Sequence, residues 1–265
     1  MAGGTGRAPL HLALGDSLAT GAWPGFPRPW LLEPGGARVL GVPASWFDHP
    51  DGAYPALVAR ACGARLVSLA GSAGTLPRLV GRDGRATPAL RAALARRPDV
   101  VTLSAGANDV LAGLARRGGA ARVLRLGGLL WRAPGGPALL PRLVDPADRD
   151  AALRVMAGRL DHLLALLAAP GRTVVATTYP VGDGAETTRR ALVGPVNAAI
   201  RDVCAAHGAR VADLERAFRG HGRRDPRAHR WISSVDGMHP TARGHRAIAG
   251  LVLAEIATAA AGPAG

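Results

Sequence analysis

Short apolar runs alternate along the chain with longer amphipathic segments. The apolar runs are bounded by glycine, proline and small polar residues, and they predict β-strands at residues 10–14, 65–69, 100–104, 173–178 and 210–212. The amphipathic segments predict helices at about residues 54–61, 88–96, 149–168, 188–207 and 241–260. Strands that alternate with helices are typical of a parallel sheet covered on both faces. The pattern therefore predicts an α/β protein, a three-layer α/β/α domain with about five parallel strands.

Two segments interrupt this alternation. Residues 21–52 are rich in proline, glycine and tryptophan, and residues 118–146 mix glycine and proline with leucine. Long irregular insertions in an α/β domain are often binding loops or lids, so these segments are either walls of a substrate cleft or tolerated surface loops. A length of 265 residues with no internal repeat fits one domain, residues 1–265, that contains both insertions.

The charge balance adds a question about partners. The net charge is +14, and all 33 basic residues are arginine. Such a balance is typical of proteins that bind nucleic acid or anionic surfaces. Here the arginines are scattered, and their longest runs are pairs such as residues 96–97. A compositional bias explains this distribution better than a basic patch does, and we expect no nucleic-acid partner.

Cysteine usage and apolar segments narrow the class further. Cys62 and Cys204 form no Cys-x-x-Cys pair or Cys/His cluster, which argues against a metal site and leaves one disulfide bridge as an open alternative. Residues 1–10 lack the apolar run of a signal peptide. The apolar run at residues 160–169 is interrupted by an aspartate and a histidine and ends at a proline, so no membrane helix is expected. The prediction is a cytoplasmic protein.

Candidate catalytic residues follow the predicted strands. In parallel sheets, ligands and catalytic groups gather beyond the carboxyl ends of the strands. Ser17 follows the first strand, Asn108 follows the third, and Asp236 and His239 precede the last helix. A serine hydroxyl becomes a nucleophile when a base takes its proton, an acid orients the base and donors await the oxyanion.

These four residues can fill those roles. Ser17 would attack, His239 would take and return the proton, and Asp236 would hold the imidazole, while Asn108 would donate to the oxyanion. The spacing of Asp236 and His239 lets both side chains share one face, so a single loop could deliver acid and base together. These residues therefore predict nucleophilic catalysis through an acyl-enzyme on Ser17.

These segments resemble the consensus blocks of the SGNH/GDSL hydrolase family. Residues 12–18 (Leu-Ala-Leu-Gly-Asp-Ser-Leu) resemble the first block, residues 106–109 (Gly-Ala-Asn-Asp) the third and residues 236–240 (Asp-Gly-Met-His-Pro) the fifth. The three matches occur in the family's order across nearly the whole chain. The resemblance implies a flavodoxin-like fold and a GDSL-type esterase or lipase that acts on small-molecule or lipid esters and needs no cofactor.

The second block departs from the family pattern. The family's early asparagine is replaced by Ser68, and its glycine, whose backbone N–H joins the oxyanion hole, falls on Ala73. A shift of one residue places that role on Gly74. Together with Ser17 and Asn108, one of these two amides would complete the oxyanion hole, since a backbone donor requires only a compatible φ angle.

Three alternatives stay open. Ser72 lies in a near match to the G-x-S-x-G turn of α/β-hydrolases, but Ala70 replaces the first glycine and Pro77 follows where a helix is expected. The same triad could pass its acyl group to an alcohol, as an acyltransferase does. The alternative that is not an enzyme is a catalytically silent binding module on the same fold.

Overall fold

The parallel sheet follows the predicted strands closely. The computed structural model describes residues 7–21, 38–39, 42–43, 50–116, 144–180, 187–222, 225–226, 229–233 and 239–261. In these ranges one parallel sheet has five strands, β1 (Leu10–Gly15), β4 (Arg65–Ser68), β5 (Val100–Ser104), β6 (Thr173–Thr177) and β7 (Arg210–Ala212). Their order in the sheet is β4-β1-β5-β6-β7, the flavodoxin-like arrangement. The predicted α/β fold class is confirmed.

The helices also match, with additions. The five predicted helices correspond to α2 (Tyr54–Ala61), α3 (Pro88–Ala95), α7 (Pro146–Leu167), α8 (Thr187–Ala206) and α10 (Ala242–Ala261). The sequence pattern missed three short helices, α1 (Ser17–Thr20), α4 (Ala107–Ala115) and α9 (Leu214–Ala217). Helix α7 begins before the predicted residue 149 because the Asp145 carboxylate accepts a hydrogen bond from the Ala147 N–H at 2.8 Å, and a proline occupies the first turn.

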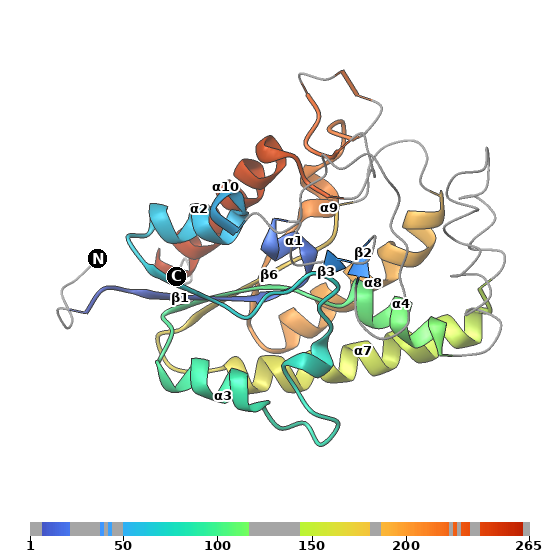
Figure 1. Ribbon diagram of the computed structural model, residues 1–265, viewed down its shortest axis with the longest axis horizontal. Coiled ribbons are helices and arrows are strands. Elements are labelled where there is room, and N and C mark those ends of the chain that lie inside the picture. Colours follow the sequence, from blue (N-terminus) through green and yellow to red (C-terminus); the bar gives the residue numbers. More distant parts are fainter. Residues whose placement is uncertain are drawn as a thin grey trace.

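Two hydrophobic cores cover the two faces of the sheet. Leu12, Leu14 and Leu103 pack with residues of α3, α4, α7 and α8 on one face. Val175 packs with residues of α1, α2, α9 and α10 on the other. Figure 1 shows α3 and α7 below the sheet and α2 and α10 above it. This alternation along each strand produces the three predicted layers.

The sheet face that meets α2 also holds a buried polar network. The Tyr54 hydroxyl lies 2.8 Å from Oγ of Ser104, which lies 2.7 Å from Oγ1 of Thr177. On the same face, Nε2 of His11 lies 2.9 Å from Oγ1 of Thr102. Buried polar groups are tolerated where they are hydrogen-bonded, and these contacts pair every polar atom named here, whereas Nδ1 of His11 has no partner among the described residues. The strands nearest the site are therefore tied together by side chains as well as by their ladders.

The two insertions are described only in part. Within residues 21–52, β2 (Arg38–Val39) pairs antiparallel with β3 (Val42–Pro43), and a short 3-10 helix η2 spans Pro50–Gly52. Most of the remaining insertion residues lie outside the described ranges, so their role as cleft walls stays a prediction. Among the described helices, none has the length and apolarity needed to cross a membrane.

The disulfide alternative is resolved. Cys62 and Cys204 are both free thiols. Cys204 belongs to the core between the sheet and helices α3 and α7, whereas Cys62 packs against the core between the sheet and helices α2 and α10. A bridge cannot form because the sheet separates the two side chains.

Candidate active site

A tight turn at the end of β1 presents Ser17. Gly15 has φ +142°, and a Cβ there would lie 2.3 Å from the Ser104 carbonyl oxygen. The next amide, that of Asp16, donates to the same carbonyl at 2.9 Å. The Asp16 carboxylate then caps α1 by accepting the Leu18 N–H at 3.0 Å. These contacts fix Ser17 as the first residue of α1, where the strand order reverses between β1 and β5.

His239 meets this serine from the far end of the chain. Its Nε2 lies 2.9 Å from Oγ of Ser17, within hydrogen-bond distance. The imidazole is buried, and its own backbone carbonyl accepts the Ser233 N–H at 2.9 Å. The structure thus brings together the predicted nucleophile and base. Asp236, the predicted acid, lies outside the described residues, and its role stays a prediction.

Asn108 lies beside the loop that carries the second block. It is the second residue of α4, and its Nδ2 donates to the Gly74 carbonyl at 3.2 Å. A Cβ at Gly74 would lie 2.5 Å from the Gly15 carbonyl oxygen and 3.3 Å from Cα of Asp16, so this loop packs directly against the serine turn. Four predicted positions, Ser17, Ala73, Gly74 and Asn108, are therefore gathered at the ends of neighbouring strands.

The two candidate backbone donors differ in whether their N–H groups are already hydrogen-bonded. The Gly74 N–H donates to the Gly71 carbonyl at 2.7 Å. Within the described part of the chain, the N–H of Ala73 has no hydrogen-bond partner. Ala73 is exposed and has φ +56°, the left-handed conformation that glycine adopts most readily. Ala73 thus has a glycine-like backbone conformation at the position where the family pattern has glycine.

Asp109 anchors the same loop. Both oxygens of its buried carboxylate lie 3.1 Å from the Leu76 N–H, which donates to them at the start of the 3-10 helix η3 (Leu76–Arg78). Burial raises the pKa of Asp109 to about 6, and the Leu76 N–H and the charge of Arg159 oppose that rise. The carboxylate holds the loop that contains Ala73 and Gly74 at a fixed distance from α4.

Asp16 is the second buried carboxylate of the site. Burial raises its pKa to about 6, against the opposing effects of a Tyr179 hydrogen bond, the Leu18 N–H and the charge of His239. The Tyr179 hydroxyl donates to Oδ2 of Asp16 at 2.6 Å. No role was predicted for Tyr179 from the sequence, although it directly follows the predicted strand at residues 173–178. A polar aromatic side chain at that edge was the signal available.

Ser72 lies in a different context from an α/β-hydrolase nucleophile. It is in a turn that leads into η3 rather than into an α-helix. Its Oγ lies 3.5 Å from Oγ1 of Thr20, whereas the imidazole of His239 contacts Ser17. The geometry favours Ser17 over Ser72.

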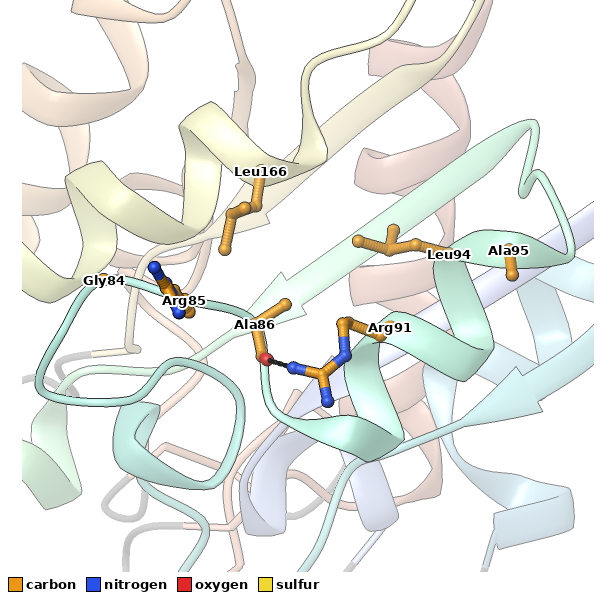
Figure 2. A pocket seen from close by; sticks show the side chains of 7 residues that line it. All are labelled: Gly84, Arg85, Ala86, Arg91, Leu94, Ala95 and Leu166. Atoms are coloured by element: carbon orange, nitrogen blue, oxygen red, sulfur yellow. Dashed lines mark hydrogen bonds between the residues drawn. The ribbon is translucent and has the colours of Figure 1, made fainter.

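A separate pocket lies away from these residues. Its volume is about 530 Å³. Figure 2 shows its lining residues, which come from the loop before α3, from α3 itself and from α7. Its lining is largely apolar, and its Arg91 guanidinium donates to the Ala86 carbonyl at 2.7 Å. None of the candidate catalytic residues lines this pocket, so it gives no reason to move the site. Across the described ranges, no group of three or more His, Cys, Asp or Glu side chains could hold a metal ion.

Comparisons with known proteins bear on the family and the fold. Residues 13–247 match the model of the GDSL-like lipase/acylhydrolase family. Phospholipase A1 from Streptomyces albidoflavus is similar in structure, with a TM-score of 0.59 and 22% identity over 94% of this chain and 100% of that one. An acetylxylan esterase from Geobacillus stearothermophilus gives a TM-score of 0.54 and 18% identity over 95% of both chains. A lipase/acylhydrolase from Enterococcus faecalis gives 0.52 and 18%, over 93% of this chain and 95% of that one. A search of curated proteins found no match.

Proposed function

The chain belongs to the GDSL-like lipase/acylhydrolase family, and from that premise we propose that it hydrolyses carboxylic esters through an acyl-enzyme on Ser17. The observation that carries the proposal is the 2.9 Å contact between Nε2 of His239 and Oγ of Ser17, residues that lie 222 positions apart in sequence. A base within hydrogen-bond reach of a hydroxyl is the first geometric requirement for nucleophilic catalysis.

The reaction proceeds in two halves. Oγ of Ser17 attacks the ester carbonyl while His239 takes the hydroxyl proton, and the tetrahedral intermediate collapses as His239 returns that proton to the departing alcohol. Water then attacks the acyl-enzyme, with His239 again accepting and returning a proton, and the carboxylic acid leaves. Asp236 orients the imidazole in this proposal.

Three donors would bind the oxyanion. They are the backbone amide of Ser17, the backbone amide of Ala73 and the side-chain amide of Asn108. We assign Ala73 rather than Gly74 because the Gly74 N–H is already bonded to Gly71, whereas that of Ala73 has no partner among the described residues. An asparagine amide carries two N–H groups, so Asn108 can donate to the oxyanion while it bonds the Gly74 carbonyl.

The family and its structural relatives support an ester as the substrate. The relatives include a phospholipase and an acetylxylan esterase, so acyl chains of very different lengths are served by this fold. We propose a small-molecule or lipid ester as substrate. Turnover of p-nitrophenyl esters from acetate to palmitate ranks acyl length directly, and product analysis with an added alcohol separates hydrolysis from acyl transfer.

Labelling with a fluorophosphonate tests the nucleophile. The wild-type protein and Ser72→Ala are expected to be labelled on Ser17 and to turn over esters. Ser17→Ala is expected to lose the label and to retain only residual turnover, and Asn108→Ala is expected to lose roughly 10²- to 10³-fold in kcat. A label that maps to Ser72, or a Ser17→Ala variant that keeps most of its activity, would overturn the proposal.

A further inference from the structure

Asn197 fixes the backbone of Tyr179 through hydrogen bonds, and the Tyr179 hydroxyl contacts Asp16. The buried Asn197 side chain on α8 accepts the Tyr179 N–H at 2.7 Å and donates to the Tyr179 carbonyl at 2.9 Å. This reciprocal pair fixes the backbone of Tyr179 as a neighbouring strand would. The preceding Thr178 is fixed too, because its hydroxyl donates to the Asp213 carboxylate at 3.1 Å. The end of β6 is therefore rigidly placed beside the serine turn.

The hydroxyl of Tyr179 reaches one group of the site. It donates to Oδ2 of Asp16 at 2.6 Å, while Oδ1 of Asp16 accepts the Leu18 N–H that begins α1. The two oxygens of one carboxylate are thus divided between Tyr179 and the helix that carries Ser17. Burial and the neighbouring Asp16 charge raise the pKa of Tyr179 well above its ordinary value, so the phenol remains a donor throughout the working pH range.

Titratable groups from four parts of the chain interact with the Asp16 carboxylate. The titratable groups that interact with it among the described residues are Tyr179 after β6, His239 before α10, Asp109 on α4 and Tyr54 on α2. His239 and Tyr179 favour its charged form, and Asp109 opposes it. Burial raises the pKa of Tyr54 to about 12, so that group is neutral.

We propose that Tyr179 is a positioning residue that keeps Asp16 ionised and fixed beside Ser17 and His239, where its charge stabilises the imidazolium formed during acyl transfer. This inference rests on the proposed function, since it gives His239 the role of base. Asn197 supports it by fixing the backbone of Tyr179. Asp16 then supplies a negative charge to the base in addition to any that Asp236 provides.

The test compares two matched tyrosine variants over pH. Tyr179→Phe removes the hydroxyl that bonds Asp16, and Tyr54→Phe removes the hydroxyl of a fully buried tyrosine that bonds Ser104 instead. Loss of a hydrogen bond to a charged group makes Asp16 a roughly 10- to 100-fold weaker acid. From a starting pKa of about 6, Asp16 is then partly protonated at pH 7.

The expected signature is a deficit that closes with rising pH. For Tyr179→Phe, kcat at pH 7 should fall roughly 2- to 10-fold below wild type and should approach wild type by pH 9, where Asp16 is ionised again. Asp16→Asn should lose activity without that recovery. The ratio of Tyr54→Phe to wild type should stay flat over the same range.

Each outcome separates the two proposals. A Tyr179→Phe ratio as flat as that of Tyr54→Phe overturns the positioning role and leaves the esterase proposal intact, provided that both variants still label on Ser17. Absence of a Ser17 label in the wild type overturns the esterase proposal, and the positioning role with it. Thermal midpoints of both variants identify any general loss of folding, which would lower activity equally at every pH.

Discussion

Ala73 offers a substitution that should stabilise the protein. Its φ of +56° places an L-residue in the left-handed region, and its side chain is exposed. That conformation costs a residue with a Cβ about 1–2 kcal/mol, whereas the greater freedom of glycine in the unfolded chain costs about 0.5–1 kcal/mol. The exposed methyl contributes little burial. Ala73→Gly should therefore raise the free energy of unfolding by about 0.5–1 kcal/mol.

Thermal and urea unfolding measure this gain. For a chain of this size, the expected rise in the midpoint is roughly 1–4 °C. Ester turnover should stay within about twofold of wild type, since the backbone amide at position 73 is kept. The assay should be run with a substrate that saturates, so that kcat is read separately from KM.

Arg97 provides the matched control. It is also exposed, and its φ is +52°, but it lies between α3 and the start of β5, at the opposite end of that strand from Asn108. Arg97→Gly should give a similar gain in stability with kcat unchanged. A fall in the midpoint of Ala73→Gly, alongside a rise for Arg97→Gly, would contradict the expected relief of backbone strain at position 73, because it would mean that the Ala73 methyl makes a favourable contact.

Substitutions at three other positions test the site and the core beside it. Gly74→Ala forces a Cβ to 2.5 Å from the Gly15 carbonyl oxygen, so we expect a loss of at least about 2 kcal/mol in urea unfolding and of most ester turnover. Asp109→Ala leaves the buried Leu76 N–H unpaired, which should cost about 1–3 kcal/mol and lower kcat, while Asp109→Asn keeps an acceptor and should lose less. Burial lowers the pKa of His245 from 6.5 to about 4, so its contribution to stability is present above pH 6.5 and is lost as the pH falls toward 4. His245→Asn keeps an acceptor for the Tyr54 N–H, and its unfolding free energy should fall less steeply between pH 6.5 and 4 than that of the wild type.

The sequence pattern predicted the sheet because each strand is a short apolar run with clear boundaries. It missed α4 because only Ala105 and Gly106 separate this helix from β5, and the helix begins within the motif that contains Asn108. It missed α1 because four residues are too few to show a helical period. The start of α7 was wrong by about one turn, since the Asp145 cap was not recognised.

The candidate site divides in the same way. Ser17, His239 and Asn108 were predicted from their places after strands and before the last helix. The structure places Nε2 of His239 in contact with Oγ of Ser17, and the catalytic roles of all three residues stay proposals. Tyr179 was not predicted, because its role depends on which strand lies beside β1 and on a clamp from α8. Such contacts between side chains distant in sequence leave no periodic trace.

The burial of Asp16 itself calls for a reason beyond capping. Serine or asparagine could cap α1 nearly as well without the cost of burying a charge, a cost reflected in the rise of the Asp16 pKa to about 6. The folded state binds a proton at Asp16 more tightly than the unfolded chain, so this carboxylate lowers stability as the pH rises from about 4 to 6. Asp16→Asn should therefore gain about 1–3 kcal/mol in urea unfolding at pH 7, relative to wild type, and lose that gain near pH 4. If the variant is instead less stable at pH 7, the Asp16 charge stabilises the folded state. If it is more stable and less active, the result supports the proposal that the Asp16 charge stabilises the His239 imidazolium.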